Sequence, residues 1–401
     1  MNMSCTDDFP RAIVMGVLLI SLLFFSFTVR SEGLDVSAKD GLSYESSAGN
    51  FAIKLGGRFH YDGSKVFSTA DENIEDGWAV RRKYAKLGLS LYKVWRLGLQ
   101  YDLESETKPY ESLWLRYSGF SAFNITLGQM SNEPFSLEES TSSNVVPFME
   151  RALPNALTPS NNVGVLLNTS GSGWSTAVGA FWETYIEDSD PFNGDEGRGV
   201  TGRFTFLPID KGDDLLHVGL SASWRWPDDT NRVRFRARPE NYVGKKRLIS
   251  SGRIKNVENY LLTGFESAYV QGPLTLQGEY IRTDLIFIDH AKENEILDGA
   301  YFYAGLFLTG EQRSYSRSRG VFGGVEPKGR YGAWELAGRY SYLDLNGDTI
   351  LGGREENLSL GLNWYANSQM RLMFNIVDVD TDEHAGDVDP LFVQMRLQVA
   401  I

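Results

Sequence analysis

The 401-residue chain has one cysteine, Cys5, and only four histidines, at positions 60, 217, 290 and 384. A single cysteine excludes an internal disulfide and a cysteine-built metal site, and the histidines lack the spacing of metal ligands. Proline, with 13 residues, is also scarce, whereas glycine contributes 41 residues and aromatic residues 13%. This composition favours a large β protein over a helical one.

Basic residues are also fewer than acidic ones. The chain has 39 lysines and arginines against 52 aspartates and glutamates, which gives a net charge of −13. A general nucleic-acid-binding protein needs a basic surface, so we expect no nucleic-acid partner. The sequence has no G-x-S-x-G nucleophile motif, and the histidines have no evident serine or aspartate partners. We therefore expect neither an enzyme nor a bound metal or cofactor.

Only one apolar run is long enough to span a membrane as a helix, and it lies near the N-terminus. It covers residues 12–29, after Arg11. A transmembrane helix is one interpretation, but the position and the small, polar residues that follow predict a secretory signal peptide. We expect the signal to cover residues 1–31, with cleavage after Ser31. Because no later run approaches 18 apolar residues, the mature chain could enter a membrane only as strands.

From Phe51 to Ile401, apolar and polar residues alternate along many short segments. In the segment 357–364, for example, leucine or tryptophan occupies every even position and polar residues occupy most odd ones. Alternation with a period of two is typical of strands with one apolar and one polar face. Short and long connections between these segments also tend to alternate, as in membrane barrels.

These segments predict a fold class. They number about sixteen, and their length of about ten residues matches a tilted strand that crosses a bilayer. Because backbone polar groups in lipid must pair internally, such strands must close on themselves. We therefore predict a transmembrane antiparallel β-barrel over residues 51–401, wide enough for an aqueous channel, with residues 32–50 as a periplasmic lead-in. A soluble β-sandwich, which also alternates, is the alternative.

If the apolar positions face lipid, the polar positions face the lumen. Basic residues outnumber acidic ones in the polar phase of the predicted strands. For any one of them, the simpler interpretation is that its charge only solvates the wall. The candidate basic residues of the lumen are Lys54, Arg58, Arg82, Lys86, Arg116 and Arg339.

One segment is strongly basic. Between Arg225 and Lys255 there are ten basic and three acidic residues, so this stretch carries +7 and the rest of the chain −20. Within it, four arginines alternate with Val233, Phe235 and Ala237. In an extended strand the guanidiniums lie about 6.6–6.8 Å apart, and neighbouring pairs repel by about 2 kcal/mol before screening. Since arginine binds phosphate through two parallel hydrogen bonds, we predict an anion-binding ladder. Its members are Arg232, Arg234, Arg236 and Arg238.

The alternative for this segment is an exposed loop that binds lipopolysaccharide phosphates from outside. The apolar face opposite the arginines favours the ladder, because that face requires a wall to pack against.

The connection 131–162 is far longer than a normal hairpin loop. Its apolar side chains argue against disorder. As the third long loop, it is well placed to fold into the lumen and narrow it, and a constriction sets selectivity through its lining residues. The candidate residues of this constriction loop are Glu133, Glu138, Glu139, Glu150 and Arg151.

Short sequences in and after this loop resemble the phosphate-selective porin O and P family. They are Glu133-Pro134-Phe135, Thr141-Ser142-Ser143, the run Phe148–Leu157, and Pro239-Glu240 after the ladder. The resemblance implies a homotrimeric outer-membrane barrel of a Gram-negative bacterium that passes phosphate or related anions. The chain departs from the family pattern in having Ser131-Asn132 before Glu133, where the family has a lysine. It also has Asn144 in place of a basic residue and Ile401 in place of a terminal aromatic residue.

We therefore expect an outer-membrane porin for passive diffusion of small anions, with phosphate or related oxyanions favoured. Its partners would be inorganic anions, outer-membrane lipid and lipopolysaccharide. The departures favour passage of anions in general over strict phosphate selectivity. The alternatives are a general porin without phosphate selectivity and a structural barrel that does not conduct.

Overall fold

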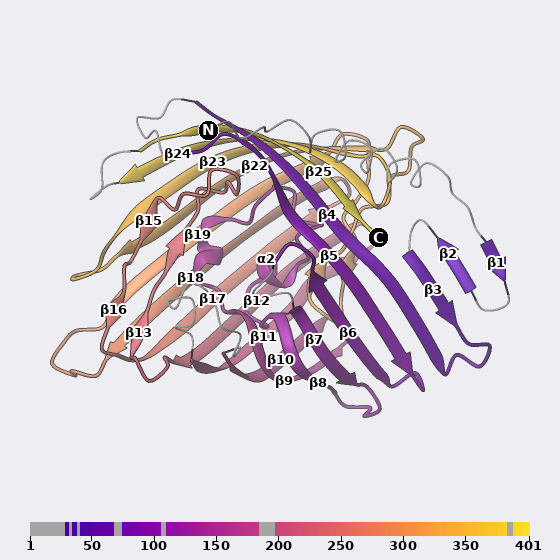
Figure 1. Cartoon of the computed structure of the whole chain (residues 1–401), viewed down its shortest axis with the longest axis horizontal. Coiled ribbons are helices and arrows are strands. Elements are labelled where there is room, and N and C mark those ends of the chain that lie inside the picture. The colour runs from indigo at the N-terminus through magenta and orange to yellow at the C-terminus, as the bar shows by residue number, and fades with distance from the viewer. Residues whose placement is uncertain are drawn as a thin grey trace, which may run out of the picture.

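The computed structural model describes residues 29–31, 34–37, 41–67, 74–105, 110–183, 197–382 and 388–401. In this part of the chain, sixteen long antiparallel strands form a closed barrel (Figure 1). They are β4 Phe51–Phe67, β5 Gly77–Leu91, β6 Trp95–Asp102, β7 Tyr110–Tyr117, β8 Asn124–Asn132, β9 Ser160–Gly171, β10 Trp174–Trp182, β11 Arg198–Lys211, β12 Asp214–Trp226, β17 Val257–Gln271, β18 Leu274–Phe287, β19 Glu295–Phe307, β22 Ala333–Asn346, β23 Leu351–Tyr365, β24 Met370–Asp382 and β25 Leu391–Ala400. The predicted fold class is confirmed. The predicted signal peptide falls almost entirely outside the described residues.

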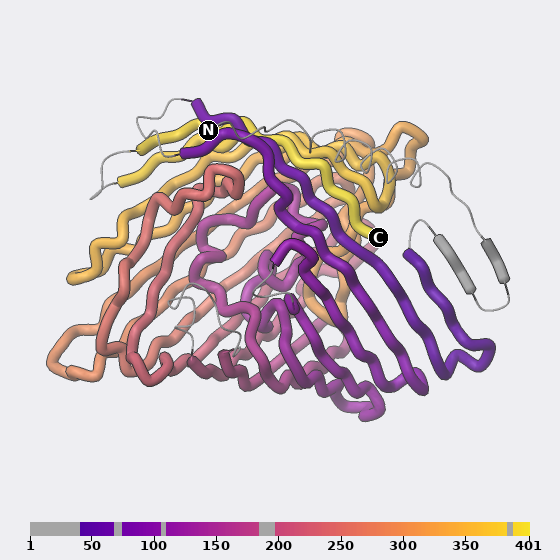
Figure 2. Tube along the Cα trace, in the orientation of Figure 1, coloured from indigo at the N-terminus to yellow at the C-terminus, as the bar shows by residue number. Residues whose placement is uncertain are grey.

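The barrel closes along β4, which is long enough to pair with two strands on one edge (Figure 2). Its second half, from Arg58 to Phe67, pairs with β25. Its first half pairs with β3 Gly41–Glu45, which continues outward into β2 Leu34–Ser37 and β1 Val29–Ser31. Gly56 lies between the two halves, and a Cβ atom there would come within 2.3 Å of the carbonyl oxygen of Ile401. Glycine thus allows the last residue to close against β4.

The outward face of the barrel is apolar. In β22, Trp334, Leu336 and Tyr340 are 37–49% exposed, whereas Glu335 and Arg339, which alternate with them, are at most 2% exposed. A soluble protein would bury the apolar set instead. A wall with lipid outside and polar groups inside requires the arrangement seen here. The prediction that the apolar faces of the strands point outward and their polar faces point into the lumen is confirmed.

Three connections pack inside the barrel. The α2 loop, residues 133–159, contains α2 Leu137–Ser140 and the 3-10 helix η1 Leu153–Leu157. The arginine loop, residues 227–256, contains β13 Arg232–Val233, β14 Arg236–Ala237, β15 Ile249–Ser250 and β16 Ile254–Lys255. The β20–β21 loop, residues 308–332, contains β20 Tyr315–Ser316 and β21 Val321–Phe322. No helix in the described residues is long and apolar enough to cross a membrane.

Hydrophobic clusters hold these loops to the inner wall. One cluster joins Leu153 of the α2 loop and Phe235 of the arginine loop to wall residues such as Leu297. A second joins Leu137 of the α2 loop to Phe322 of the β20–β21 loop. Apolar residues on the inner face are therefore concentrated where loops cover them. The remaining inner face is polar and lines cavities.

Candidate functional site

Three adjoining cavities follow the inside of the barrel. The outer chamber, 240 Å³, lies between the α2 loop, the arginine loop and β5. The middle chamber, 590 Å³, lies between the strand wall, the α2 loop and the β20–β21 loop. The inner chamber, 300 Å³, lies between β4, β5, β6 and β7 near Ile401. Arg82 and Arg151 line both the outer and the middle chamber, and Gln100 and Trp114 line both the middle and the inner one.

Basic side chains line all three chambers. Those of the outer chamber are Arg81, Arg82, Arg151, Arg236, Arg238 and Arg247. Those of the middle chamber are Arg58, Arg82, Arg116, Arg151, Arg203 and Arg319. Those of the inner chamber are Lys54, Lys86 and Arg96. All but one of the predicted basic lumen residues therefore line the cavities, and the exception is Arg339.

Ion pairs neutralise several acidic residues along the chambers. Glu150 accepts hydrogen bonds from Nε and Nη2 of Arg81, at 2.9 and 3.0 Å, and from Arg396 at 2.7 Å. Burial acts to raise the pKa of Glu150, but the guanidiniums of Arg81 and Arg396 outweigh it and hold the pKa well below its ordinary value. Glu139 pairs with Arg151 at 2.9 Å. In the inner chamber, none of the described lining residues is acidic.

We call the region where the outer and middle chambers meet, at Arg82 and Arg151, the neck; buried hydrogen-bond donors without acceptors lie in it, at Arg82, and beside it, at Arg58 of the middle chamber. Arg58 donates to Ser142 and Ser143 of the α2 loop at 3.0 and 2.9 Å. Its Nε and the Nη1 of Arg82 are buried and have no hydrogen-bond partner within the described residues. Buried donors are almost always paired in proteins. Because these atoms are covered by protein, an anion could accept from them only after the guanidiniums turn toward the cavity.

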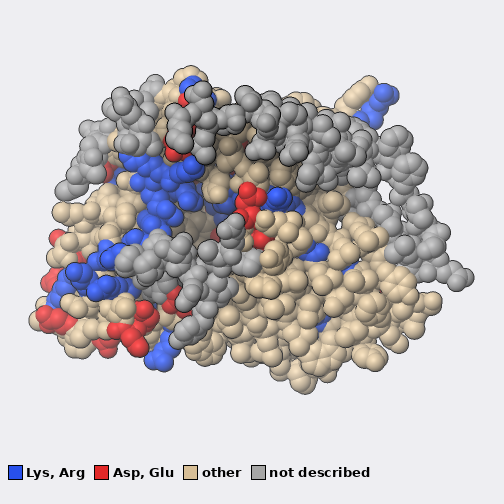
Figure 3. All heavy atoms as spheres, in the orientation of Figure 1, with Lys and Arg blue, Asp and Glu red and all other residues tan. Residues whose placement is uncertain are grey.

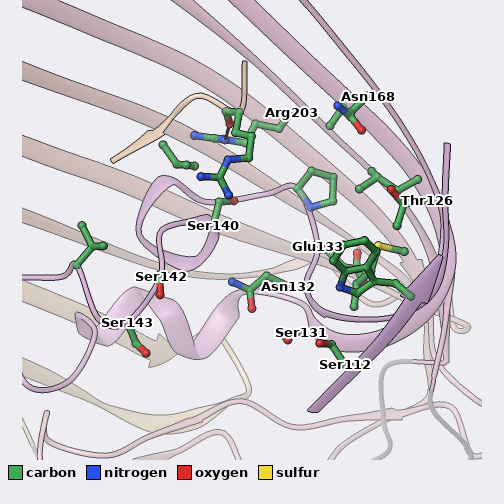
Figure 4. A pocket seen from close by; sticks show the side chains of 18 of the residues that line it. Ser112, Thr126, Ser131, Asn132, Glu133, Ser140, Ser142, Ser143, Asn168 and Arg203 are labelled. Carbon is green, nitrogen blue, oxygen red and sulfur yellow. Dashed lines mark hydrogen bonds between the residues drawn. The ribbon is translucent and has the colours of Figure 1, made fainter. Parts of the chain in front are cut away.

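Hydroxyl and amide groups complete the middle chamber (Figure 4). Ser140 and Asn132 approach it from the α2 loop and its entry, whereas Thr126 and Asn168 project from the strand wall. Such neutral groups can replace part of the hydration shell of an ion without fixing it in place. The chamber therefore combines positive charge with weak polar contacts.

The predicted ladder lies in the arginine loop as two short strands rather than one. Val233, Phe235 and Ala237 are 2–7% exposed and pack on the inner wall, as the alternation predicted, while the four arginines are half-buried. Arg236 and Arg238 line the outer chamber. Arg232 lies directly opposite Lys255 in the β13–β16 pair. Figure 3 shows Lys and Arg side chains gathered on this face around a hollow.

The candidate glutamates of the α2 loop mainly attach it to the wall. Glu133 and Glu138 are 1–2% exposed, and Glu133 accepts two hydrogen bonds from Arg225 at 3.0 and 3.1 Å. Glu138 lies 3.3 Å from Arg339. Burial raises the pKa of Glu138 to about 7 despite that neighbour. Their part in selectivity stays a prediction, since the structure places their charges in pairs.

Several lining residues were not among the candidates from the sequence. Arg81 is one residue from Arg82, yet both line the outer chamber. Tyr242 holds the guanidiniums of Arg81 and Arg238 over its ring, at 4.4 and 5.4 Å from the ring centre. Arg319 comes from the β20–β21 loop. The high basic content of residues 225–255 was the available signal for Arg247, whereas no sequence pattern placed Arg319 near the pore.

No three His, Cys, Asp or Glu side chains of the described residues are placed to hold a metal ion.

Comparisons with known proteins agree with this architecture. Residues 53–401 match the family model described as phosphate-selective porin O and P. The chain is 28% identical to Porin O of Pseudomonas aeruginosa, over 95% of this chain and 96% of that protein. An anion-selective porin from Comamonas acidovorans has a similar structure, with a TM-score of 0.56 at 12% identity, covering 88% of this chain and all of that one. The trimer form of OmpT from Vibrio cholerae also has a similar structure, with a TM-score of 0.55 at 10% identity, covering 88% of this chain and 99% of that one.

Proposed function

Because the chain belongs to the phosphate-selective porin O and P family and is an outer-membrane porin of a Gram-negative bacterium, we propose that its three chambers conduct small anions by diffusion. Phosphate and related oxyanions are the favoured cargo. The observation that carries the proposal is the unbroken series of basic side chains through all three chambers. Each anion would exchange part of its hydration shell for guanidinium and hydroxyl groups.

The arrangement supports passage rather than tight binding. Arg236 and Arg238 in the outer chamber and Arg58 below them offer successive sites for an anion. Several weak sites in series allow entry and release, whereas one tight site would trap the ion. Arginine forks match the oxygens of phosphate better than they match chloride. We therefore propose a preference for oxyanions that appears as lower chloride current when phosphate is present.

We also propose that the protein works as a homotrimer. The outward face of β6, β7, β8 and β10, which have eight or nine residues each, is the shortest wall of the barrel. This wall carries an aromatic cluster in which Trp95, Phe120 and Phe123 are exposed and Tyr117 is partly exposed. Strands of eight or nine residues lie at or just below the lower limit for a bilayer crossing, and such a wall is suited to face other subunits. The remaining wall would contact lipid and lipopolysaccharide.

Alanine at Arg232, Arg234, Arg236 and Arg238 is expected to lower anion conductance about threefold to tenfold, because the outer chamber loses two lining charges and its loop loses two more. Single-channel recording in a planar bilayer measures the effect. The matched control replaces four cations that line none of the three chambers: Lys211, Lys328 and Arg330, which are exposed, and Arg282, which is partly exposed. Equal losses in both quadruple variants would show that overall charge, not the ladder, drives conduction.

A general porin without oxyanion preference is the second candidate, and Asn144 in the α2 loop favours it. That position bears an amide that contacts His60 at 3.0 Å, so it brings no positive charge to the neck. Chloride currents recorded with increasing phosphate distinguish the two candidates. Phosphate should block chloride current in an oxyanion-preferring channel and leave it unchanged in a general one.

A further inference from the structure

Arg339 is the exception among the predicted basic lumen residues. It lies on the inner face of β22, is 2% exposed and lines none of the three chambers. Its guanidinium contacts the α2 loop and the arginine loop at once. It lies 3.3 Å from Glu138 of the α2 loop and 2.5 Å from Glu240 of the arginine loop. We call Arg339, Glu138 and Glu240 the loop junction.

On the arginine-loop side, Glu240 is tied to three strands. Its carboxylate accepts hydrogen bonds from Ser341 at 2.5 Å and from Ser359 at 2.8 Å, and its carbonyl oxygen accepts one from Gln394 at 3.2 Å. The backbone at Glu240 has φ of 50°, an uncommon conformation for a residue other than glycine. Such a conformation persists where its surroundings fix it. Glu240 therefore sets where the chain turns after the ladder.

On the α2-loop side, Glu138 bonds within its own loop as well as to Arg339. Its carboxylate accepts hydrogen bonds from the backbone of Ala152 at 2.9 Å and from Asn155 at 3.2 Å. Arg339 also donates to the carbonyl oxygen of Glu150 at 3.1 Å and lies 4.2 Å from the centre of the Phe148 ring. Arg339 thus contacts this loop at Glu138, Phe148 and Glu150, and Glu138 extends the connection to Ala152 and Asn155.

The two loops joined here form facing walls of the outer chamber. Arg151 and Ala152 line it from the α2 loop, and Arg238 and Asn241 line it from the arginine loop. Two residues that contact Arg339, Glu150 and Glu240, line this chamber themselves. A shift of either loop at the junction would change the distance between Arg151 and Arg238 across the chamber.

We infer that Arg339 is a positioning residue that couples the two loops. It thereby sets the width of the outer chamber and limits the fluctuations of that width. This inference rests on the proposed function, because it concerns the same channel. It differs from the expectation that Arg339 supplies charge to the path. In the junction, one buried cation faces two carboxylates, so it adds no net positive charge to the lumen.

The test compares Arg339→Gln with Arg116→Gln, which removes the same charge from a residue that lines the middle chamber. In planar bilayers, Arg339→Gln should raise open-channel current noise about threefold, and in liposomes it should admit larger neutral sugars. Its reversal potential in a salt gradient should shift less than that of Arg116→Gln, with the remaining shift caused by Glu240, which lines the outer chamber and loses its cation partner. Arg116→Gln should show the opposite pattern, with a shifted reversal potential and unchanged noise.

Two further variants separate charge from geometry. Arg339→Lys keeps the charge but loses the planar fork of the guanidinium. Its current noise should therefore lie between that of the wild type and that of Arg339→Gln. Glu240→Gln keeps hydrogen-bonding capacity toward the two serines and should give a smaller rise in noise than Arg339→Gln. The double variant should be no noisier than Arg339→Gln alone, because both changes break one junction. Heat-modified mobility on gels verifies that each barrel is closed.

The inference is overturned if Arg339→Gln shifts the reversal potential like Arg116→Gln while noise and sugar size limit stay unchanged. It is also overturned if none of these quantities changes. If Arg339→Gln does not fold, Glu240→Gln serves as the test instead. Current noise equal to that of the wild type in Glu240→Gln would overturn the inference. Because neutral sugars report bore without regard to ion sign, a cation-preferring wild type would defeat the proposed function and leave this test intact.

Discussion

Glutamate in place of Arg82 is expected to lower the ratio of anion to cation permeability at least about tenfold and to reverse the preference of the channel. Arg82 lines both the outer and the middle chamber, so an ion that moves between these two chambers passes close to it. At an effective dielectric of about 20, one charge acts on an ion about 5 Å away with roughly 3 kcal/mol, before salt screening. The substitution changes that charge by two units. Reversal potentials in a salt gradient measure the ratio.

Lys83→Glu is the matched control. Lys83 is the next residue of β5, its side chain is 41% exposed, and it pairs with Glu104 at 3.7 Å on the outer face. The control changes the same charge on the same strand, but on the opposite side of the wall. A similar shift in both variants would mean that ions sense the charge of the whole protein rather than the neck.

Alanine in place of Arg225 is expected to release the start of the α2 loop. Arg225 and Glu133 form a fully buried pair, and Glu133 also accepts hydrogen bonds from Asn162 at 2.7 Å and from Thr201. Removing one partner leaves a buried charge without compensation, which costs about 3–5 kcal/mol. The loop should then detach from β11 and β12, raise conductance and lower the melting temperature.

Two controls accompany this prediction. The double variant Glu133→Leu, Arg225→Met removes both charges, and its stability should stay within about 1 kcal/mol of the wild type or exceed it. Arg317→Ala breaks the exposed pair with Asp210, and it should cost less than about 1 kcal/mol. A melting temperature for Arg225→Ala equal to that of Arg317→Ala would contradict the anchoring role of Glu133.

The barrel could be predicted from the sequence because its main determinant is local. A period of two appears within a single strand, and it fixes which side chains face lipid wherever the strand lies. The alternation of the ladder around Phe235 is equally local, and the buried apolar face matches it. The break between β13 and β14 was not predicted, since all seven residues from 232 to 238 fit one strand.

The attachment of the loops could not be predicted, because their partners are far apart in the chain. Glu133 and Arg225 are separated by 92 residues, and Arg339 and Glu240 by 99. Strand periodicity shows that Arg339 faces inward but not that a loop covers it. The same limit applies to the β20–β21 loop, whose inward packing depends on contacts such as that of Tyr315 with His217, 98 residues apart.

The reversal potential of the unmodified channel in a potassium chloride gradient tests most directly whether the basic path selects anions. The account predicts a potential close to the equilibrium potential of chloride, which moves toward zero as added salt screens the guanidiniums. A potential close to the equilibrium potential of potassium would contradict it.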